Sequence, residues 1–353
     1  MEAKRMNAPT RVALVGRVEN PLAIKTADRI WNFLKGKGMK MEVQRGFLKR
    51  PNAREIREFD ADLVLSFGGD GTLLHVFREL GEGNAPVLGI NCGELGFLTD
   101  VDYSMIDAHI TNVMKGQYYI EPRGRLDFSI DSERLPHALN EGIIVPSKSL
   151  SLLRYGLNVN QEYLWRDNAD ALIISTPTGT TGHALSAGGP VINYNARVIA
   201  VVPMNSTNQA SRPLVVPDDA TVTAYDISAA SPPDLVIDGQ VRVKCGSEVS
   251  ARKSKHPALL ARIYASSYAA PRRIRKKTET AEMEILKTAP PSSKFVFHLL
   301  EFEGPLTQKE IIAATMLPAR TVRRGLDCLI GRGIIVKKPF LGDPRQSLYV
   351  ISR

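Results

Sequence analysis

Short apolar runs and segments with helical apolar spacing alternate along the first hundred residues. The runs 11–16, 63–65 and 86–90 predict buried strands, and the apolar positions between residues 23 and 34 recur at helical spacing. This alternation is typical of a parallel sheet covered by helices, which binds its ligands at the carboxyl ends of the strands. We therefore expect an α/β domain with a parallel sheet over residues 1–117. The first strand is not followed by G-x-G-x-x-G, so a dehydrogenase-type dinucleotide site is not expected.

The pattern changes after residue 117 to short strand-like runs separated by turn residues. Such a succession indicates a mainly-β second domain over residues 118–270. The runs that predict its strands are 126–130, 152–159, 171–175, 220–224 and 235–237.

A third small unit is expected at residues 292–353, after a basic and proline-containing linker at 271–291. Thr307 and Glu310 have the spacing of a capping box, in which each side chain binds the backbone N–H of the other residue at the start of a helix. Three helical patterns, at 292–302, 308–314 and about 317–330, are followed by two strand patterns, at 334–338 and 347–351. This order predicts a small winged-helix C-terminal domain.

The composition is that of an ordinary globular protein, with 353 residues, 43% hydrophobic and 24% charged. No run approaches the roughly 18 apolar residues of a membrane-spanning helix, and no signal-peptide pattern is present. Cys92, Cys245 and Cys328 are far apart in sequence, which indicates neither a disulfide framework nor a zinc site and suits a reducing cytoplasm.

The net charge of +9 lies almost entirely at the C-terminal end. Residues 271–353 hold 16 basic and 8 acidic side chains, whereas residues 1–270 hold 30 and 29. This asymmetry indicates a separate C-terminal unit with an acidic partner.

A glycine-rich motif directly follows the apolar run that ends at Ser66. Gly68, Gly69 and Gly71 allow a ligand to approach the backbone closely, and the helix predicted to follow offers free N–H groups to a phosphate. Asp70 is a carboxylate within this motif, and it would repel phosphate unless it binds a metal or accepts a proton from a hydroxyl group. The alternative is a tight turn in which Asp70 only caps the helix.

Three further clusters carry groups suited to ribose and phosphate oxygens. They are Asn91–Leu98 after a strand, Asn140-Glu141 before an apolar run, and the segment Asp170–Pro190, whose loop is rich in hydroxyl groups and glycine. Each cluster is a weak signal by itself, and Asn140-Glu141 is equally compatible with a plain turn.

Taken together and in this order, the motifs closely resemble those of the NAD kinase family. The resemblance covers about residues 10–267. The matching stretches are Gly68–Thr72, Asn91–Leu98, Asn140-Glu141, Ser175–Pro190, Arg212–Pro217 and Asp238-Gly239-Gln240.

The resemblance implies an activity and its cofactors. The family phosphorylates the 2′-hydroxyl of the adenosine ribose of NAD to give NADP. The donor is ATP or polyphosphate, and Mg²⁺ or another divalent cation is required, with metal ligands that the sequence leaves open. Relatives are dimers or tetramers, so a homo-oligomer is expected by resemblance.

The resemblance also implies roles for single residues. Asp70 corresponds to the general base, and Gly68 and Gly69 correspond to residues that face the donor phosphates. The positions that correspond to NAD contacts are Gly71, Phe97, Asn140, Glu141, Asp170, Thr178, Thr181, Gly182, His183 and Ser186.

The chain departs from the family pattern at two places. Gly182-His183 stands where the family has Ala-Tyr, and we hypothesise that His183 lines the NAD pocket; the alternative is a surface histidine on a short helix. The segment 204–211 lacks the histidine that commonly precedes the Arg-Pro pair.

The C-terminal unit leaves its partner open between DNA and protein. Arg320, Arg323 and Arg324 lie on the expected recognition helix, and Lys337, Lys338 and Arg345 lie around the expected wing. Such residues would give salt-dependent phosphate contacts, or a solvated basic face on a module for protein contacts or dimerisation. Two other functions also stay open, an NAD(P)-sensing transcriptional regulator with a kinase-like body and a diacylglycerol-type lipid kinase.

Overall fold

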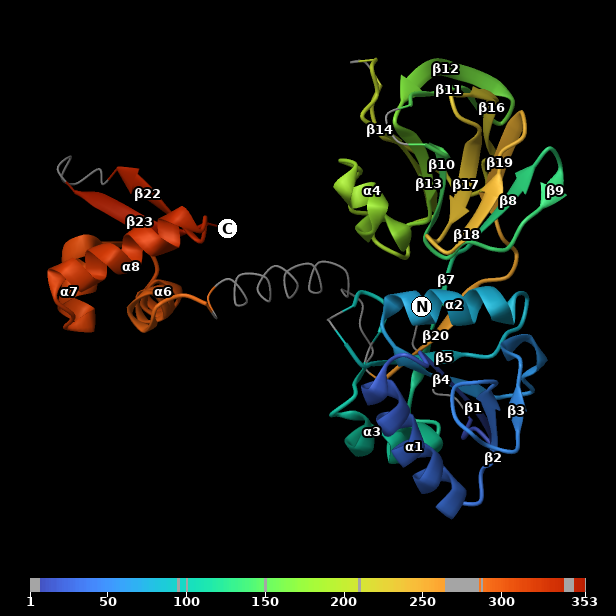
Figure 1. Ribbon diagram of the computed structural model, residues 1–353, viewed down its shortest axis with the longest axis horizontal. Helices are drawn as coiled ribbons and strands as arrows, with labels where there is room; N and C mark the ends of the chain where they lie inside the picture. The colour runs from blue at the N-terminus through green and yellow to red at the C-terminus, as the bar shows by residue number, and fades with distance from the viewer. Residues whose placement is uncertain are drawn as a thin grey trace. The chain divides into compact units, whose positions relative to one another are not determined.

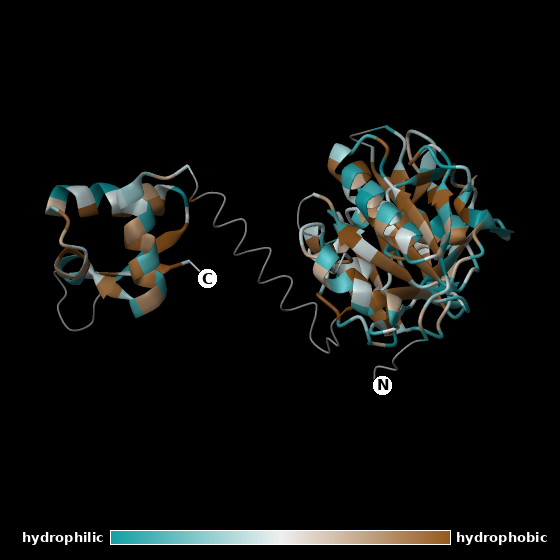
Figure 2. Cartoon of the chain, turned by 90° about the horizontal axis from the view of Figure 1, so that it is seen from below, coloured by the Kyte–Doolittle hydropathy of each residue, from teal (hydrophilic) through white to brown (hydrophobic). Residues whose placement is uncertain are grey.

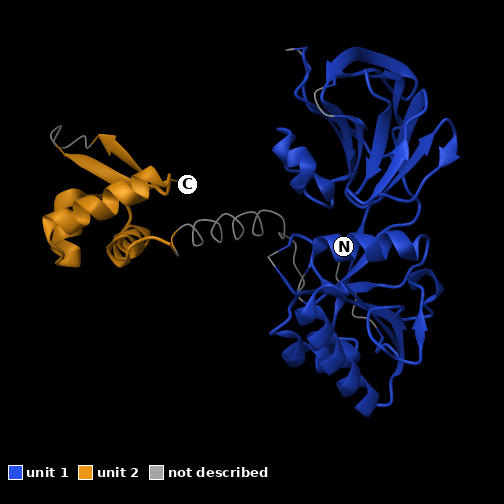
Figure 3. Ribbon diagram, in the orientation of Figure 1, with its two compact units in different colours: residues 1–270 blue, residues 271–353 orange. Residues whose placement is uncertain are grey.

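The structure, a computed structural model, comprises two compact units, residues 1–270 and 271–353, and each is described by itself (Figure 3). The residues that the structure describes are 7–93, 96–99, 101–148, 151–208, 211–263, 286, 288–339 and 346–352. Glu94, Leu95, Arg345 and residues 271–285 and 287 of the expected linker lie outside the described residues.

The first unit begins with an eight-stranded sheet in the order β3-β2-β1-β4-β5-β20-β7, with β6 paired to β5 (Figure 1). All neighbouring strands are parallel except β20 and β7, which are antiparallel. The strands are β1 (Arg11–Gly16), β2 (Lys40–Gln44), β3 (Ala53–Arg54), β4 (Leu63–Gly68), β5 (Val87–Asn91), β6 (Val101–Asp102), β7 (Tyr119–Arg123) and β20 (Ala258–Arg262).

The expected division between an α/β domain at 1–117 and a β domain at 118–270 does not coincide with the sheets. Strands β7 and β20 come from the second range but complete the first sheet, which is therefore mixed rather than purely parallel. An apolar run predicts a strand but not the strand with which it pairs, so the sequence pattern could not show this return.

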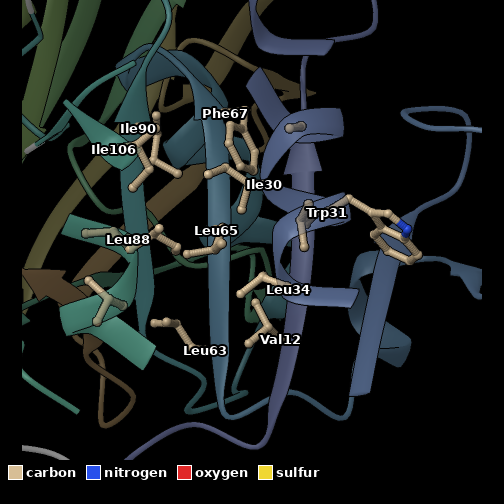
Figure 4. Close-up of a cluster of buried hydrophobic side chains, with 14 of the residues drawn as sticks. Val12, Ile30, Trp31, Leu34, Leu63, Leu65, Phe67, Leu88, Ile90 and Ile106 are labelled. Atoms are coloured by element: carbon tan, nitrogen blue, oxygen red, sulfur yellow. The ribbon is translucent and has the colours of Figure 1, made fainter. Parts of the chain in front are cut away.

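Helices cover both faces of this sheet. Helices α1 (Pro21–Gly36) and α3 (Ile106–Met114) pack on one face in a cluster that includes Ile30, Leu65 and Leu88 (Figure 4). Helix α2 (Asp70–Leu80) packs on the other face, and the short 3-10 helix η1 (Ile56–Glu58) contributes Ile56 there. Burial of these apolar side chains, at about 25 cal/mol per Å², is the main stabilising contribution to this layer.

The remainder of the first unit is a sandwich of two six-stranded antiparallel sheets around one apolar core. In the first unit as a whole, apolar residues are concentrated on strands, whereas the helices carry many polar residues (Figure 2). One sheet has the order β15 (Leu214–Pro217), β14 (Val198–Met204), β13 (Ala171–Ser175), β10 (Glu141–Pro146), β17 (Pro233–Ile237) and β18 (Val241–Lys244). The other has the order β12 (Glu162–Ala169), β11 (Leu153–Val159), β16 (Val222–Ser228), β19 (Glu248–Lys253), β8 (Leu126–Ile130) and β9 (Glu133–Arg134).

Within the described residues 288–339 and 346–352, the second unit contains three helices and a three-stranded antiparallel sheet. Thr307 and Glu310 form the expected capping box at the start of the second helix, with the Thr307 N–H donating to Glu310 Oε2 at 2.7 Å. The helices and strands are α6 (Pro291–Glu303), α7 (Gln308–Thr315), α8 (Ala319–Gly331), β21 (Leu306–Thr307), β22 (Ile335–Pro339) and β23 (Ser347–Ile351). The three expected helices and the two expected strands are present, and β21 adds a third strand that is too short to give a sequence signal.

Within the described part of the chain, every helix is too short or too polar to cross a bilayer.

Candidate active site

The glycine-rich motif lies where the strand order of the first sheet reverses. From β1 the chain proceeds outward through β2 and β3, and it then returns to β4 on the other side of β1. Such a switch point opens a crevice at the carboxyl ends of the strands. The loops after β1 and β5 meet there, because Asn20 Nδ2 donates to the Cys92 carbonyl at 2.9 Å.

The Asp70 carboxylate is held by the backbone of the loop after β5. It accepts N–H groups from Phe97 at 2.6 Å, Leu98 at 2.9 Å and Thr99 at 3.2 Å. Gly96 makes this approach feasible, because a Cβ atom at that position would lie 2.1 Å from Asp70 Oδ1. A carboxylate has about four acceptor positions, so one remains for a ligand hydroxyl.

The three motif glycines differ in what they provide. A Cβ at Gly68 would lie 2.1 Å from Thr72 Oγ1, so this glycine permits close packing between β4 and α2. A Cβ at Gly69 or Gly71 would meet nothing within 4 Å. The backbone at the start of α2 is therefore accessible to a ligand. The first N–H groups of a helix can bind an anion only when they are accessible in this way.

Asn140 and Glu141 are held in place by Asp238. The Asp238 carboxylate accepts the N–H groups of Leu139 and Asn140 at 2.8 Å each, and that of Glu141 at 3.1 Å. Burial raises the pKa of Asp238 to about 6, although the three N–H groups favour its ionised form. The carboxylate is therefore ionised above about pH 6 and fixes the start of β10.

The same turn also holds the start of α2. Gln240 Nε2 donates to the Gly71 carbonyl at 2.7 Å, and Gln240 Oε1 accepts from Arg78 Nη1 at 2.7 Å. One tight turn, Asp238-Gly239-Gln240, thus contacts both the Asn140-Glu141 pair and the residue next to Asp70.

Several buried oxygens of these motifs have no hydrogen-bond partner among the described residues. They are Thr72 Oγ1, Asn91 Oδ1, Thr99 Oγ1, Asn140 Oδ1 and Glu141 Oε2. Buried polar atoms are almost always hydrogen-bonded in folded proteins. These unpartnered oxygens therefore mark candidate positions for hydrogen bonds with a ligand.

The hydroxyl-rich loop after β13 packs directly against Asn140. The Thr176 N–H donates to the Asn140 carbonyl at 2.8 Å, and a Cβ at Gly179 would lie 2.3 Å from that oxygen. Thr178 is buried within this loop. The Thr181 hydroxyl donates to the Thr178 carbonyl at 3.3 Å, in the 3-10 helix η2 (Gly179–Thr181).

His183 contacts the buried Glu141. Its Nδ1 lies 2.7 Å from Glu141 Oε1, and a Cβ at Gly182 would lie 3.4 Å from the bare Glu141 Oε2. The hydrogen bond to Glu141 raises the pKa of His183. His183 and Ser186 belong to the short helix α4 (His183–Ser186) and are exposed.

Asp170 lies apart from Asn140, Glu141 and the loop after β13. It precedes β13, is exposed and accepts a hydrogen bond from Asn205 Nδ2 at 2.8 Å. The hydroxyl-rich loop follows the other end of that strand. At about 3.3 Å per residue, the two ends lie roughly 17 Å apart.

The basic residues expected to contact nucleic acid lie on the surface of the second unit. Arg320, Arg323 and Arg324 are exposed on α8, and Lys337 and Lys338 are exposed on β22.

Comparison with known proteins supports the motif assignment. The family model described as "ATP-NAD kinase N-terminal domain" matches residues 12–118, and that described as "ATP-NAD kinase C-terminal domain" matches residues 139–263. The chain is 31% identical over 284 residues to the NAD kinase of Methanothermobacter thermautotrophicus, covering 78% of this chain and 99% of the relative. The chain belongs to the NAD kinase family. Its activity is that of an NAD kinase, a phosphotransferase.

Other members of the NAD kinase family are similar to this chain in sequence and in fold. The NAD kinase of Thermococcus gammatolerans is 34% identical over 264 residues, covering 71% of this chain and 94% of the relative. Yeast NADH kinase complexed with NADH has the same fold, with a TM-score of 0.69, 23% identity, and coverage of 76% of this chain and 87% of that one. An NAD kinase from Archaeoglobus fulgidus in complex with ATP has a TM-score of 0.63 at 25% identity, with 75% and 98% covered. The second unit lies beyond both family models.

The sequence missed several residues that build the NAD kinase site. Gly96 and Gln240 stand in the matching motifs, but their residue types indicate no role. Glu121, Arg123 and Arg262 lie on β7 and β20, outside the runs that predict strands, so no sequence signal pointed to them.

Replacement of Asp238 tests whether its carboxylate fixes the start of β10. In Asp238→Asn, an NH₂ group faces a backbone N–H, so at least one buried donor loses its partner. We expect the free energy of unfolding at pH 8 to fall by about 1–3 kcal/mol, measured by denaturant unfolding. Asp131→Asn is the control, because Asp131 also has a positive φ and accepts the Glu248 N–H, but it is exposed. Equal losses in the two variants would contradict this role.

The His183–Glu141 pair predicts a pH-dependent contribution to stability. Because the pKa of His183 is raised in the folded state, its contribution is complete below the ordinary value of 6.5 and is lost as pH rises through the raised pKa. His183→Gln is therefore expected to be less stable than the parent at pH 6, by less than about 1 kcal/mol for so exposed a pair, and equally stable at pH 9. Denaturant unfolding at both pH values measures this; a difference that is constant with pH would refute it.

Proposed function

We propose that this chain transfers the γ-phosphoryl group of ATP to the 2′-hydroxyl of the adenosine ribose of NAD. The observation that carries the proposal is the pair of buried, bare acceptors Asn140 Oδ1 and Glu141 Oε2 on a segment fixed by Asp238. Ribose hydroxyls are donors that would satisfy these oxygens. The resemblance assigns the same two residues to NAD.

Asp70 is the general base of this proposal. A ribose hydroxyl is a weak nucleophile at neutral pH and must lie within hydrogen-bond reach of a carboxylate. The hydroxyl proton passes to the free acceptor position of Asp70, the ribose oxygen bonds to the γ-phosphorus, and the bond to the leaving ADP oxygen breaks. The three N–H groups of Phe97, Leu98 and Thr99 hold the carboxylate still for this transfer.

The donor phosphates are assigned to the backbone around Gly68 and Gly69, at the start of α2. In this position the N–H groups offset the charge that develops on the transferred group. The described residues contain no cluster of three His, Cys, Asp or Glu side chains suited to a metal. The divalent cation is therefore assigned to the nucleotide, as part of the ATP substrate; polyphosphate is the alternative donor.

The remaining NAD contacts are assigned to the loop after β13 and to Phe97 and Gly71. Thr178, Thr181, Gly182, His183 and Ser186 follow one another there, next to Glu141. Asp170 lies at the other end of β13, so we assign it to the site of a second copy in a homo-oligomer.

Asp70→Asn tests the general base. Loss of a general base costs about 10²–10⁴ in rate, or roughly 3–5 kcal/mol of transition-state stabilisation. We expect turnover in a coupled NADP assay to fall by at least this factor, while calorimetry shows NAD binding largely unchanged. Asp102→Asn is the control, because the Asp102 side chain is exposed and accepts hydrogen bonds from Ser104. Near-normal turnover of Asp70→Asn would end the assignment.

A second function is proposed for the C-terminal unit, namely DNA binding by a winged helix. It is supported by the order of three helices and a hairpin and by the exposed arginines of α8. Arg320 and Arg324 are four residues apart and lie on one face of the helix.

A salt-titrated gel shift with mixed DNA fragments tests this function. The parent chain is expected to shift the fragments at low salt. Arg320→Gln/Arg324→Gln is expected to bind more weakly and with a shallower salt dependence, because each phosphate contact adds about one unit to the slope. Absence of a shift at low salt would favour protein contacts or dimerisation instead.

A further inference from the structure

Three buried charged side chains lie together at the junction of β7 and β20. Glu121 and Arg123 belong to β7, and Arg262 ends β20, the antiparallel neighbour of β7. Their side chains are only 11%, 6% and 4% exposed, respectively. Burying a charge costs free energy unless the charge is paired and hydrogen-bonded. The presence of three buried charges here therefore calls for a structural or functional explanation.

Both arginines bind the same carboxylate oxygen. Arg123 Nη2 lies 2.6 Å and Arg262 Nε lies 3.0 Å from Glu121 Oε1. Burial alone would raise the pKa of Glu121, but the two guanidinium groups outweigh it and hold that pKa below its usual value. Glu121 is therefore ionised throughout the neutral range and acts as a fixed anchor for both cations.

Each arginine also reaches one loop of the site. Arg262 Nη1 donates to the Leu98 carbonyl at 2.7 Å, and the N–H of the same Leu98 donates to Asp70 at 2.9 Å. Arg123 Nη1 donates to Thr178 Oγ1 at 3.2 Å. A continuous series of hydrogen bonds thus runs from Asp70 through Glu121 to the loop assigned to NAD.

Arginine suits this task because its donors are fixed in one plane. A guanidinium can bind a carboxylate with one edge and a loop oxygen with another, whereas a lysine ammonium is a single point of charge on a flexible stem. The plane of Arg123 is fixed further by Tyr194, whose ring centroid lies 3.8 Å from the Arg123 Cζ atom.

We propose that Glu121, Arg123 and Arg262 are positioning residues that act as one unit and fix the loop holding Asp70 relative to the loop at Thr178. None of the three is assigned contact with substrate. The proposal rests on the proposed kinase function, because its effect is on the alignment of base and acceptor hydroxyl. A misplacement of about 1 Å at a reacting group can cost on the order of 10²-fold in rate.

The test uses Arg262→Lys, Arg123→Lys and the double variant in the full chain, with a coupled NADP assay and denaturant unfolding. Arg262→Lys keeps a positive charge near Glu121 but cannot also hold the Leu98 carbonyl. We expect kcat to fall about tenfold or more while KM for NAD and ATP changes less than about threefold. Because both arginines act through Glu121, the double variant is expected to lose less kcat/KM than the product of the single losses.

Arg125→Lys is the matched control. Arg125 is equally buried and follows β7, but its guanidinium donates to the carbonyls of His256 at 2.5 Å and Phe77 at 3.3 Å, outside both loops. This variant is expected to lose stability without losing kcat. If Arg262→Lys does not fold, Arg123→Lys makes the same comparison through the Thr178 loop, with an expected tenfold loss in kcat/KM.

The outcomes separate the two proposals. If the parent chain forms no NADP, the proposed function fails before any variant is measured. If the parent is active, a kcat for Arg262→Lys within twofold of the parent overturns the positioning unit. An equal loss of kcat in Arg125→Lys, or single losses that multiply in the double variant, would overturn it as well.

Discussion

The central constraint in the proposed active site is a negative charge held next to the backbone that is assigned to the donor phosphates. Asp70 lies at the start of α2, next to the open backbone of Gly69, one of the glycines that we propose face the donor phosphates. Its carboxylate would repel those phosphates and move away if it were free. Three backbone N–H groups from residues 97–99 prevent this movement, because they partly offset its charge and fix both oxygens. The absence of a side chain at Gly96 is what allows the loop to come so close.

The α/β half and the sandwich half of the first unit both contribute residues to the proposed active site. Asp70, the proposed general base, begins α2 beside the first sheet, whereas Asn140 and Glu141, with their bare acceptors, lie at the start of a strand of the sandwich. The turn at residues 238–240 contacts both, through the Asp238 carboxylate and the Gln240 amide. The site is therefore held by several directional hydrogen bonds between its parts rather than by one rigid element, which suits a reaction that depends on alignment.

Local patterns predicted most elements of this fold, because strand and helix periods are set within a few residues. The capping box at Thr307 and the strand ending at Gly68 are examples. Local patterns could not predict which segments, far apart in sequence, contact one another. Three features join segments that are far apart in sequence. They are the hydrogen bonds from residues 97–99 to Asp70, the ion pairs of the buried Glu121 with two arginines, and the pairing of β20 with strands of the first sheet. Asp170 and Thr178 lie at opposite ends of β13, so the contact of both residues with one NAD molecule stays a prediction.

The pairing of β20 also affects how the chain matures during synthesis. The strand β5 is made early, but its neighbour β20 follows about 170 residues later, after the whole sandwich. At typical translation speeds of roughly 5–20 residues per second, this interval lasts about ten seconds or more. During that time the nascent first sheet has an incomplete edge beside β5, and such edges invite unwanted pairing with other chains. Chaperone protection of the growing polypeptide would have its greatest value in this interval.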